Sequence, residues 1–376
     1  LYGDRVVIHH HPGPSLPYGS FFANLVVSDR TLRTGGLPSS VKEVVRLLRP
    51  GGLAMIGQSR SARVAADGLT SDQLGQWTAQ SDVGTWSIKD QDGLWAMLRR
   101  EPLPGGGEWT QLYANAGHTA CSNDSVEGPM TLQWFGAPGP RRIIDRHHRP
   151  MSSLAKDGRI FVPANDAVIA VDAFNGTRLW ETEVPNSRRI GAMKNSGQML
   201  IEGDDLYIAA EDECWAIDAT TGHRTAVIDV PKLDGDESCH WGYLNCVGDR
   251  LYGTGVKPTA TFTKTWTGGA SYLEGDFRPV VIGRSVFSVD RRSGRTLWMY
   301  EKGAVMNSAI AIGQGRIYFA ESYRPDVVSD EDGRVRIDHF CEGPARLVAL
   351  DCSTGATVWE RPVDLPHQHI MFLVVA

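Results

Sequence analysis

The sequence predicts a mainly β protein built of repeated units, preceded by a smaller α/β segment. Three observations support this fold class. One nine-residue pattern recurs between residues 172 and 359, each time after a short run of β-forming residues. The 11 Trp and 41 Gly residues suit an all-β repeat architecture. Residues 1–100 instead combine two continuous apolar runs with a helical pattern between them.

The repeated pattern begins with Asp, has Gly at its fifth position and Trp at its ninth. Its clearest copies span Asp172–Trp180, Asp290–Trp298 and Asp351–Trp359. A degenerate copy begins at Asp218 and has Ala226 in place of the Trp. Asp opens a turn by accepting hydrogen bonds from nearby backbone N–H groups, and Gly supplies the positive φ that such a turn needs. We therefore expect each copy to be a hairpin turn, and each Trp to pack against the neighbouring unit.

This pattern resembles the pyrroloquinoline-quinone (PQQ) repeat of quinoprotein-like β-propellers, whose blades carry the signature Asp-x-x-Thr-Gly-x-x-x-Trp. The resemblance covers residues 130–376. It implies a β-propeller, an architecture shared with WD40/YVTN-like proteins, with four full blades and part of others. Because propellers close by lending an N-terminal strand to the last blade, we expect Thr131–Phe135 to be that strand. Residues 367–376 are expected to begin a fifth blade, so that the propeller is truncated at the C-terminus.

Residues 1–100 contain the pattern of one β-α-β unit. Phe21–Asp29 begins with a continuous apolar run of the kind found in buried parallel strands. Ser39–Leu48 begins with Ser and places its apolar residues on one helical face. Arg49–Gly52 then stops the helix, and Leu53–Gly57 is a second buried strand. These elements predict one right-handed crossover between parallel strands.

The unit resembles the second half of a class I S-adenosylmethionine (SAM)-dependent methyltransferase. The matching residues are Asn24–Asp29 and Leu48–Gly52, the latter a Leu-x-Pro-Gly-Gly turn. If the family's cofactor binds, the resemblance implies that Asn24, Ser28 and Asp29 line its edge, because such sheets bind ligands at the carboxyl ends of strands. The glycine-rich loop and acidic ribose-binding residue of the family's first half are not visible. We therefore favour a fragment that begins within such a domain over a domain that never had the cofactor site.

A Pro- and Gly-rich stretch separates the two kinds of sequence. Glu101–Gly107 is typical of a flexible linker. The predicted organisation is thus a methyltransferase-like α/β fragment over residues 1–100, a linker over 101–108, and a PQQ-repeat propeller over 109–376.

Composition narrows the possible partners. The net charge of −6 gives no reason to expect nucleic acid or an anionic membrane as a partner. No apolar run approaches the ~18 residues of a transmembrane helix. The chain opens at Leu1 without a charged leader pattern, so any signal segment would lie upstream. The six cysteines include no Cys-x-x-Cys pair, and localisation stays open between an exported or periplasmic protein and a cytoplasmic one.

A candidate binding site follows from the propeller resemblance. Because blade strands alternate in direction, the starts of first strands and the ends of second strands share one face of the disc, its mouth. Two long insertions, Val256–Ser285 and Ser322–Arg346, follow second strands and are expected to overhang this mouth. The candidate ligand-binding residues at the starts of first strands are His148, Asn195, His240, Trp241, Asn307 and His367. The alternative is that these side chains only bind backbone groups and water.

The sequence does not favour a metal or quinone site. Arg146–Arg149 contains adjacent histidines, whose side chains would point to opposite faces of a strand, and His9–His11 precedes a Pro-Gly-Pro turn. No calcium loop of the Asp-x-Asp-x-Asp-Gly type can be assigned. Quinone-dependent alcohol dehydrogenases with this repeat have adjacent cysteines beside the cofactor, and this sequence has no Cys-Cys pair. We therefore expect neither a metal nor PQQ.

The function favoured by the sequence is a non-catalytic propeller that binds a ligand or protein, or acts as a scaffold, fused to a methyltransferase-like domain. The expected partner is a small molecule, a protein or a peptide at the mouth. The alternative is a SAM-dependent methyltransferase in the full-length protein, with the propeller presenting substrate. A PQQ-dependent oxidoreductase is the least favoured hypothesis. Whether the protein is an enzyme, which ligand it binds and how it oligomerises stay open.

Overall fold

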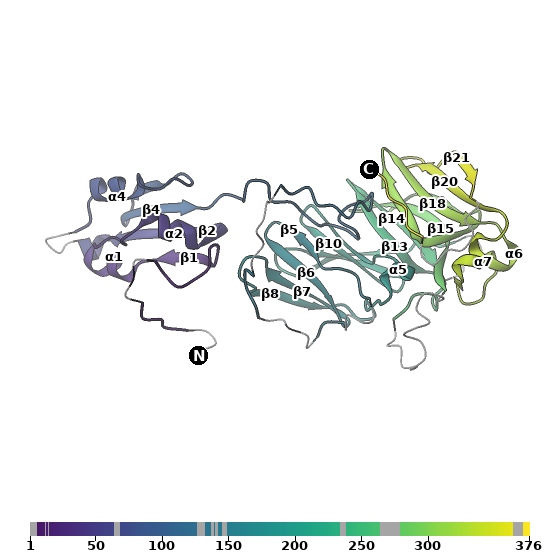
Figure 1. Cartoon of the computed structure of the whole chain (residues 1–376), viewed down its shortest axis with the longest axis horizontal. Coiled ribbons are helices and arrows are strands. Elements are labelled where there is room, and N and C mark those ends of the chain that lie inside the picture. Colours follow the sequence, from purple (N-terminus) through teal and green to yellow (C-terminus); the bar gives the residue numbers. More distant parts are fainter. Residues whose placement is uncertain are drawn as a thin grey trace. The chain divides into compact units, whose positions relative to one another are not determined.

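The chain forms two compact units in a computed structural model (Figure 1). The described residues are 6–11, 13, 15–63, 68–125, 132–136, 139, 142–144, 149–233, 238–263, 279–363 and 371–376. The first unit comprises Leu1–Gly106, Ser125–Phe135 and Phe174–Gly176, and the second comprises the rest of the chain. Among the described residues, no helix combines the length and apolar character needed to cross a membrane.

The first unit is built on a four-stranded sheet in the order β1-β2-β4-β3. β1 (Ala23–Val27) and β2 (Leu48–Ser59) are parallel and are connected through α2 (Val41–Leu47). β4 (Gly93–Arg99) pairs antiparallel with β2, and β3 (Ser87–Asp90) pairs antiparallel with β4. The predicted parallel β-α-β connection is therefore confirmed, although β2 already begins before the Pro-Gly-Gly turn. β1 is not the buried strand that its apolar run predicts, because it forms an edge of the sheet, and Leu25 and Val27 are 56% and 55% exposed.

The helices of this unit begin at the residues that cap them. Ser40 accepts a hydrogen bond from the backbone of Glu43 at the start of α2, which satisfies an otherwise unpaired N–H group. Thr70 and Gln73 form a reciprocal capping box at the start of α4. Here α4 spans Ser71–Thr78, and the other helices of the unit are α1 (Asp29–Thr34) and α3 (Arg60–Arg63). One core cluster joins α2 and α4 to the sheet and contains Val41, Val44, Val45, Leu48, Ala54, Ile56, Trp77 and Leu98.

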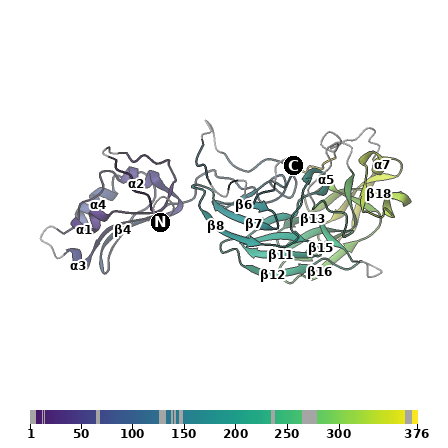
Figure 2. The ribbon, with the colours of Figure 1, turned by 90° about the horizontal axis from the view of Figure 1, so that it is seen from below.

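The second unit contains four consecutive four-stranded blades, whose strands fan out one blade after another in Figure 2. Blade 1 consists of β5 (Leu154–Lys156), β6 (Arg159–Ala164), β7 (Ala167–Asp172) and β8 (Arg178–Glu183). Blade 2 consists of β9 (Met199–Glu202), β10 (Asp205–Ala210), β11 (Glu213–Asp218) and β12 (Arg224–Asp229). Blade 3 consists of β13 (His240–Val247), β14 (Arg250–Val256), β15 (Val280–Asp290) and β16 (Thr296–Tyr300). Blade 4 consists of β17 (Ala304–Gly313), β18 (Arg316–Ser322), β20 (Ala345–Asp351) and β21 (Thr357–Pro362).

Each blade is an antiparallel meander, in which every strand pairs with the next one in the blade. Blades 3 and 4 are also joined directly, because the start of β17 pairs with β15 through Met306 and Ile282. The protein is thus mainly β with propeller-type blades, as the repeats predict.

The repeated Asp and Gly form the turn between the third and fourth strand of each blade. Asp351 accepts hydrogen bonds from the backbone N–H groups of Ser353 and Thr354. Asp218 and Asp290 make the equivalent bonds in blades 2 and 3. The Gly residues of all four copies have a positive φ, between 70° and 75°. The predicted hairpin turns are therefore confirmed.

The repeated Trp packs on the turn of the following blade. The ring of Trp298 in blade 3 lies over Gly355 of blade 4, and its Nε1–H donates to the carbonyl of Cys352 at 2.9 Å. Trp180 of blade 1 makes the same contact with Gly222 of blade 2. A Cβ on either glycine would meet the ring at 2.6 Å, so the glycine is required for contact as well as for φ. The prediction that the rings wedge against neighbouring blades is confirmed for these two.

Because Ala226 stands at the Trp position of the repeat in blade 2, no repeat ring lies between blades 2 and 3. Gly294, the turn glycine of blade 3, has only Ile228 near the position of a Cβ, at 3.7 Å. Arg291 of blade 3 instead donates to Asp205 and to the Tyr207 hydroxyl of blade 2, at 3.1 and 3.2 Å. An ion pair thus lies at the junction that lacks the ring.

Replacing Gly355 by Ala is expected to lower the free energy of unfolding by about 2–3 kcal/mol, since it adds a Cβ against Trp298 to a strained φ. Gly294→Ala is the matched control: its φ is nearly the same, at 70° against 71°, without a ring above it. We expect the control to lose only the strain energy, about 1 kcal/mol. Urea denaturation measures both, and equal losses would contradict the packing explanation.

The segment Trp109–His118, the axial strap, runs across the first strands of all four blades. Its hydrogen bonds join Trp109 to Ala155 of β5, Thr110 to Ile201 of β9, Gln111 to Cys246 of β13, and Ala116 to Ile312 of β17. Near the end of the strap, the carbonyl of Gly117 accepts a hydrogen bond from the backbone N–H of Val375, near the C-terminus. It therefore ties the inner edges of the blades together.

The predicted closing strand is not formed. Residues 132–136 have no strand structure, and Leu132 and Phe135 are 80% and 94% exposed. Thr131 lies outside the described residues. The prediction for Thr131–Phe135 is wrong over its described part, because in this region of the chain it is the axial strap that binds the blades. The predicted fifth blade begins on residues 367–370, which lie outside the described residues as well, and residues 371–376 have no strand structure.

Candidate functional site

In blades 3 and 4, the first strand departs from regular pairing in its first half, on the side of the predicted mouth. The pairing of β13 with β14 shifts between Trp241 and Leu244, and that of β17 with β18 shifts between Val305 and Ile310. Bulges of this kind re-aim side chains and are frequent beside functional sites. In blade 4 the shift includes the buried polar pair Asn307 and Ser308.

Blade 2 reaches the same region through a short helix. α5 (Ala192–Asn195) begins after Gly191, whose φ is 66°, and ends at Ser196, whose φ is 76°. A residue other than Gly at such a φ is strained and is held there by its surroundings. α5 lies against β15 and β17, so it brings the start of blade 2 to the first strand of blade 4.

Asn195 is completely buried at the end of α5. Its Nδ2 donates to the carbonyl of Ile190 at 3.2 Å and to that of Phe262 at 3.5 Å. These two acceptors fix the amide orientation, because only the nitrogen can donate. Its Oδ1 is buried and has no hydrogen-bond partner among the described residues.

Asn307 is the counterpart of Asn195 on β17 and is also completely buried. Its Oδ1 accepts from the Thr254 hydroxyl at 2.8 Å, and that hydroxyl accepts from the backbone of Tyr243 at 2.9 Å. Its Nδ2 finds no acceptor within the described part of the chain. A Cβ on Gly242 would lie 2.5 Å from this nitrogen, so the amide sits directly against the backbone of β13.

The hydroxyls of Ser196 and Ser308, next to these asparagines, are likewise buried without a described partner. We call Asn195, Ser196, Asn307 and Ser308 the axial polar cluster. A buried amide or hydroxyl without a partner is unfavourable by about 1–3 kcal/mol. Such groups are normally satisfied by ordered water or by a ligand, so the cluster is a candidate binding position.

The nearby cation Arg189 is already engaged. It is 5% exposed and donates through its guanidinium to the backbone carbonyls of Trp241 and Gly242. Burial lowers its pKa to about 10, which leaves it charged at neutral pH. Its role in this arrangement is to fix the backbone of β13 beside the cluster.

His240 and Trp241, two predicted mouth residues, lie on opposite faces of β13. His240 is half-buried, and burial lowers its pKa against the opposing influence of Glu211 and Asp212. Trp241 is completely buried and its ring meets the Phe287 ring edge-on, with centroids 4.9 Å apart. The Trp241 ring therefore fills the blade core.

Of the other predicted mouth residues, Asn195 and Asn307 belong to the cluster, whereas His148 and His367 lie outside the described residues. The predicted cofactor-edge residues belong to the first unit. Ser28 caps α1 by accepting from the backbone of Thr31. Asp29 is exposed and lies 3.7 Å from Arg33, and Asn24 is exposed on β1.

The described parts of the two insertions pack together. β19 (Arg334–Val335), from the second insertion, pairs with the start of β15 at Val280 and Val281. Arg334 donates to the carbonyl of Ala260 in the first insertion at 2.7 Å, and its guanidinium lies 4.4 Å above the Phe262 ring. Phe262 also accepts from the backbone of Ile190, so the first insertion reaches the axial polar cluster. The second insertion further contains α6 (Pro325–Val328) and α7 (Ile337–Cys341).

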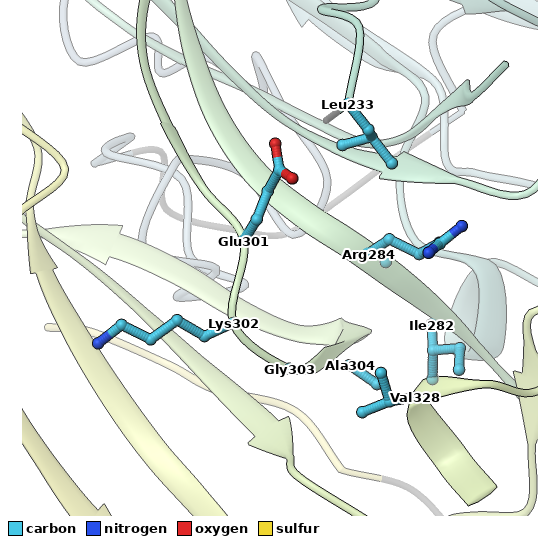
Figure 3. Close-up of a pocket in the computed structure, with 9 residues that line it drawn as sticks. Leu233, Ile282, Arg284, Glu301, Lys302, Gly303, Ala304 and Val328 are labelled. Atoms are coloured by element: carbon cyan, nitrogen blue, oxygen red, sulfur yellow. The ribbon is translucent and has the colours of Figure 1, made fainter. Parts of the chain in front are cut away.

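A cavity of about 170 Å³ opens beside the cluster (Figure 3). Leu233, Ile282 and Val328 give it apolar walls. The Glu301 side chain extends toward Leu233, whereas Lys302 points away and binds Glu360 at 3.3 Å. We call this cavity the blade 3–4 pocket.

Gly283 separates this pocket from the axial polar cluster. It lines the pocket, and a Cβ there would lie 3.3 Å from Asn307 Oδ1. Sequence analysis missed the pocket, because the turn that contributes Glu301 carries no motif. The one available signal was the second insertion, whose α6 supplies Val328.

The described residues contain no group of three or more His, Cys, Asp or Glu side chains that could hold a metal ion. The six cysteines are all free. The groups that converge on the site are amides, hydroxyls, the Glu301 carboxylate and the Arg284 guanidinium, which suit polar binding.

One family model matches part of this unit. Described as outer membrane protein assembly factor BamB, it matches residues 109–241, which is less than half of the chain. The matched residues include blades 1 and 2 and the two repeat copies that begin at Asp172 and Asp218. No curated protein sequence matches the chain.

Solved structures similar to the chain include quinohemoprotein alcohol dehydrogenase ADHIIG from Pseudomonas putida HK5, at 17% identity and a TM-score of 0.43 over 69% of this chain and 40% of that one. A europium-containing methanol dehydrogenase shows 13% identity and a TM-score of 0.44, over 69% of this chain and 49% of that one. BamB from Moraxella catarrhalis shows 14% identity and a TM-score of 0.31, over 74% and 75%. The chain spans less than half the length of the two dehydrogenases, and likeness at this level carries no inference about function.

Proposed function

We propose that the propeller is a non-catalytic binding module, which takes a peptide segment of a protein partner at the face formed by the two insertions. The observation that carries the proposal is the axial polar cluster, whose buried amide and hydroxyl atoms have no described partner. Asn195 offers an acceptor and Asn307 a donor. A peptide group has one N–H donor and one carbonyl acceptor and is the complement of this pair; because both asparagines are completely buried, the peptide would reach them after the insertions move aside.

The blade 3–4 pocket gives the same ligand a place for a side chain. Its walls of Leu233, Ile282 and Val328 suit an aliphatic stem, and the Glu301 carboxylate suits a cationic end. Lys and Arg side chains combine these two properties. The proposal therefore includes a Lys or Arg of the partner as the residue that enters the pocket.

The match of residues 109–241 to a family described as an outer membrane assembly factor supports a protein as partner rather than a small molecule. Assembly factors act on other proteins, and repeat propellers present broad loop faces for this purpose. That the whole protein binds a protein partner is part of this proposal.

Glu301→Lys is expected to weaken peptide binding by about tenfold or more, since it replaces attraction by repulsion in the pocket. The measurement starts from a peptide library displayed on phage and selected against the whole chain, followed by fluorescence anisotropy of synthesised peptides. Glu331→Lys is the matched control, because it makes the same charge change at an exposed position on the second insertion. We expect it to change affinity by less than about twofold.

Two results would contradict this proposal. One is a set of selected peptides without Lys or Arg. The other is an equal loss of affinity in the two charge variants, which would indicate a general electrostatic effect of the face rather than a specific pocket.

A second candidate function is SAM-dependent methylation by a longer chain, favoured by the parallel pairing of β1 and β2 across α2. Ser28 and Asp29 follow directly after the carboxyl end of β1, where such sheets bind ligands. The test is calorimetric titration of SAM into the natural full-length protein, with this chain as control. Micromolar binding by the longer protein alone would support methylation, and no binding by either would leave the propeller face as the functional surface.

A further inference from the structure

The axial strap holds one side chain that its surroundings do not satisfy. His118 is 4% exposed and has a φ of 56°, so both its burial and its backbone conformation are imposed by the fold. Neither Nδ1 nor Nε2 has a hydrogen-bond partner within the described residues. A buried imidazole normally has at least one partner, so this position is exceptional.

The groups that face His118 are aromatic. The ring of Tyr113, from the strap, and the ring of Tyr243, from β13, each meet the imidazole edge-on with centroids 5.9 Å apart. Burial raises the pKa of both phenols, so they stay neutral. Asn245, on the same strand as Tyr243, donates to the carbonyl of Ala116 at 3.4 Å, and its own Oδ1 lacks a described partner.

Gln111 and Asn245 join the strap to β13 by hydrogen bonds, as elsewhere along the strap, whereas the His118 ring has no hydrogen bond to a described residue. Here a neutral ring is held by packing alone. An imidazolium placed in the same position would be a buried charge without a described acceptor, which is strongly unfavourable. Solvent would satisfy that charge once the ring left the junction.

We infer that His118 is a proton-operated latch: the neutral ring holds the strap against β13, and protonation releases the strap from the inner edges of the blades. Because the strap is bonded near the ends of the first strands, at Ile201, Cys246 and Ile312, its release opens the axis on the face opposite the two insertions. This inference concerns the strap alone and does not rest on the proposed peptide site.

The direction of the pH dependence follows from burial, which lowers the pKa of His118 from 6.5 to about 4. Burial is the one cause of this shift, with no contribution from a charged neighbour. A depressed histidine pKa means that the attachment is fully present above 6.5 and weakens as the pH falls toward 4. Between about pH 7.5 and about pH 5, this shift corresponds to roughly a thirtyfold rise in the equilibrium constant for release.

Hydrogen exchange measured by mass spectrometry on the whole chain tests the latch. We compare the peptide of residues 109–118 with that of β10, at both pH values, after correction for the intrinsic exchange rate. In the wild type, protection of the strap relative to β10 is expected to fall about thirtyfold at the lower pH. His118→Phe keeps a neutral ring and should lose this pH dependence, whereas His223→Phe, at an exposed turn position, should retain it.

A second measurement does not depend on the variant's folding. An NMR titration of the wild-type His118 ring should give an apparent pKa below about 5.5. A ring that titrates near 6.5 would overturn the inference, as would equal pH dependence of strap protection in the wild type and a folded His118→Phe variant.

Discussion

Replacing Trp298 by Ala is expected to lower the free energy of unfolding by about 3–5 kcal/mol, because the ring joins blade 3 to blade 4. The ring is 8% exposed, packs on Gly355 and lies 6.1 Å from the Tyr252 ring. Its loss would also remove the Nε1–H donor that the Cys352 carbonyl has at 2.9 Å and leave that carbonyl with the Tyr252 hydroxyl, which donates to it at 3.3 Å. Cavity formation and this lost hydrogen bond act together.

Trp359→Ala is the matched control, since Trp359 holds the same position of the repeat in blade 4 but is only partly buried. Urea denaturation with Trp fluorescence measures both variants, and we expect the control to lose less than half as much as Trp298→Ala. Trp180→Ala should resemble Trp298→Ala, because Trp180 is 9% exposed and donates to Ala219 at 3.1 Å. A loss below about 1 kcal/mol for Trp298→Ala would remove the ring from the core.

Replacing Glu321 by Ala is expected to destabilise the fold by about 3–5 kcal/mol, as the removal of one partner from a buried polar network does. Glu321 is completely buried in β18. Its carboxylate accepts from the hydroxyls of Tyr300 and Tyr323 at 2.8 and 2.7 Å and from the backbone of Gly303 at 2.7 Å. Alanine would leave three donors unsatisfied and a cavity beside them.

The pH dependence of the free energy of unfolding separates the effect of the Glu321 charge from the effect of its hydrogen bonds. Burial raises its pKa, so the protonated form suits the folded state better and the carboxylate's contribution to stability declines as the pH rises from the ordinary value of 4.5. Glu321→Gln keeps a carbonyl acceptor without the charge. We therefore expect the stability of this variant, relative to the wild type, to improve between about pH 4.5 and about pH 7.5.

Glu301→Gln serves as the control for this experiment, because it makes the same change from carboxylate to amide at an exposed position. Denaturation at several pH values gives both differences. The contrary result would be a free energy of unfolding of Glu321→Gln that falls, relative to the wild type, as the pH rises. It would mean that the three donors stabilise the carboxylate more than burial destabilises it.

The repeats could be predicted because their physical rules are local. Asp218, Asp290 and Asp351 form their turns with residues at most five positions away, and each turn glycine is required by its φ. The β-α-β unit followed in the same way from apolar periodicity and from Ser at the helix start. In both cases the information lies within one short stretch of sequence.

The axial strap and the blade 3–4 pocket could not be predicted, because both depend on distant contacts. Gln111 meets Cys246 across 135 positions, and no pattern in either segment announces this contact. The strand predicted at Thr131–Phe135 failed for the same reason, since tertiary contacts decide which segment binds the blades. Asn195 and Asn307 could be chosen because they lie near the starts of first strands. That Asn195 Oδ1 and Asn307 Nδ2 lack described partners depends on α5 and on the bulge in β17, which no local pattern predicts.

The substitution of Ala226 for Trp makes the four blades mechanically unequal. Blades 1 and 2, and blades 3 and 4, are joined by a ring that excludes water, whereas blades 2 and 3 share an apolar core and add the Arg291–Asp205 ion pair where the ring is absent. Salt screens an ion pair that is partly open to solvent and leaves apolar packing intact or strengthened. The junction between blades 2 and 3 therefore has a salt-sensitive contribution in addition to its apolar core, and high ionic strength would weaken that contribution.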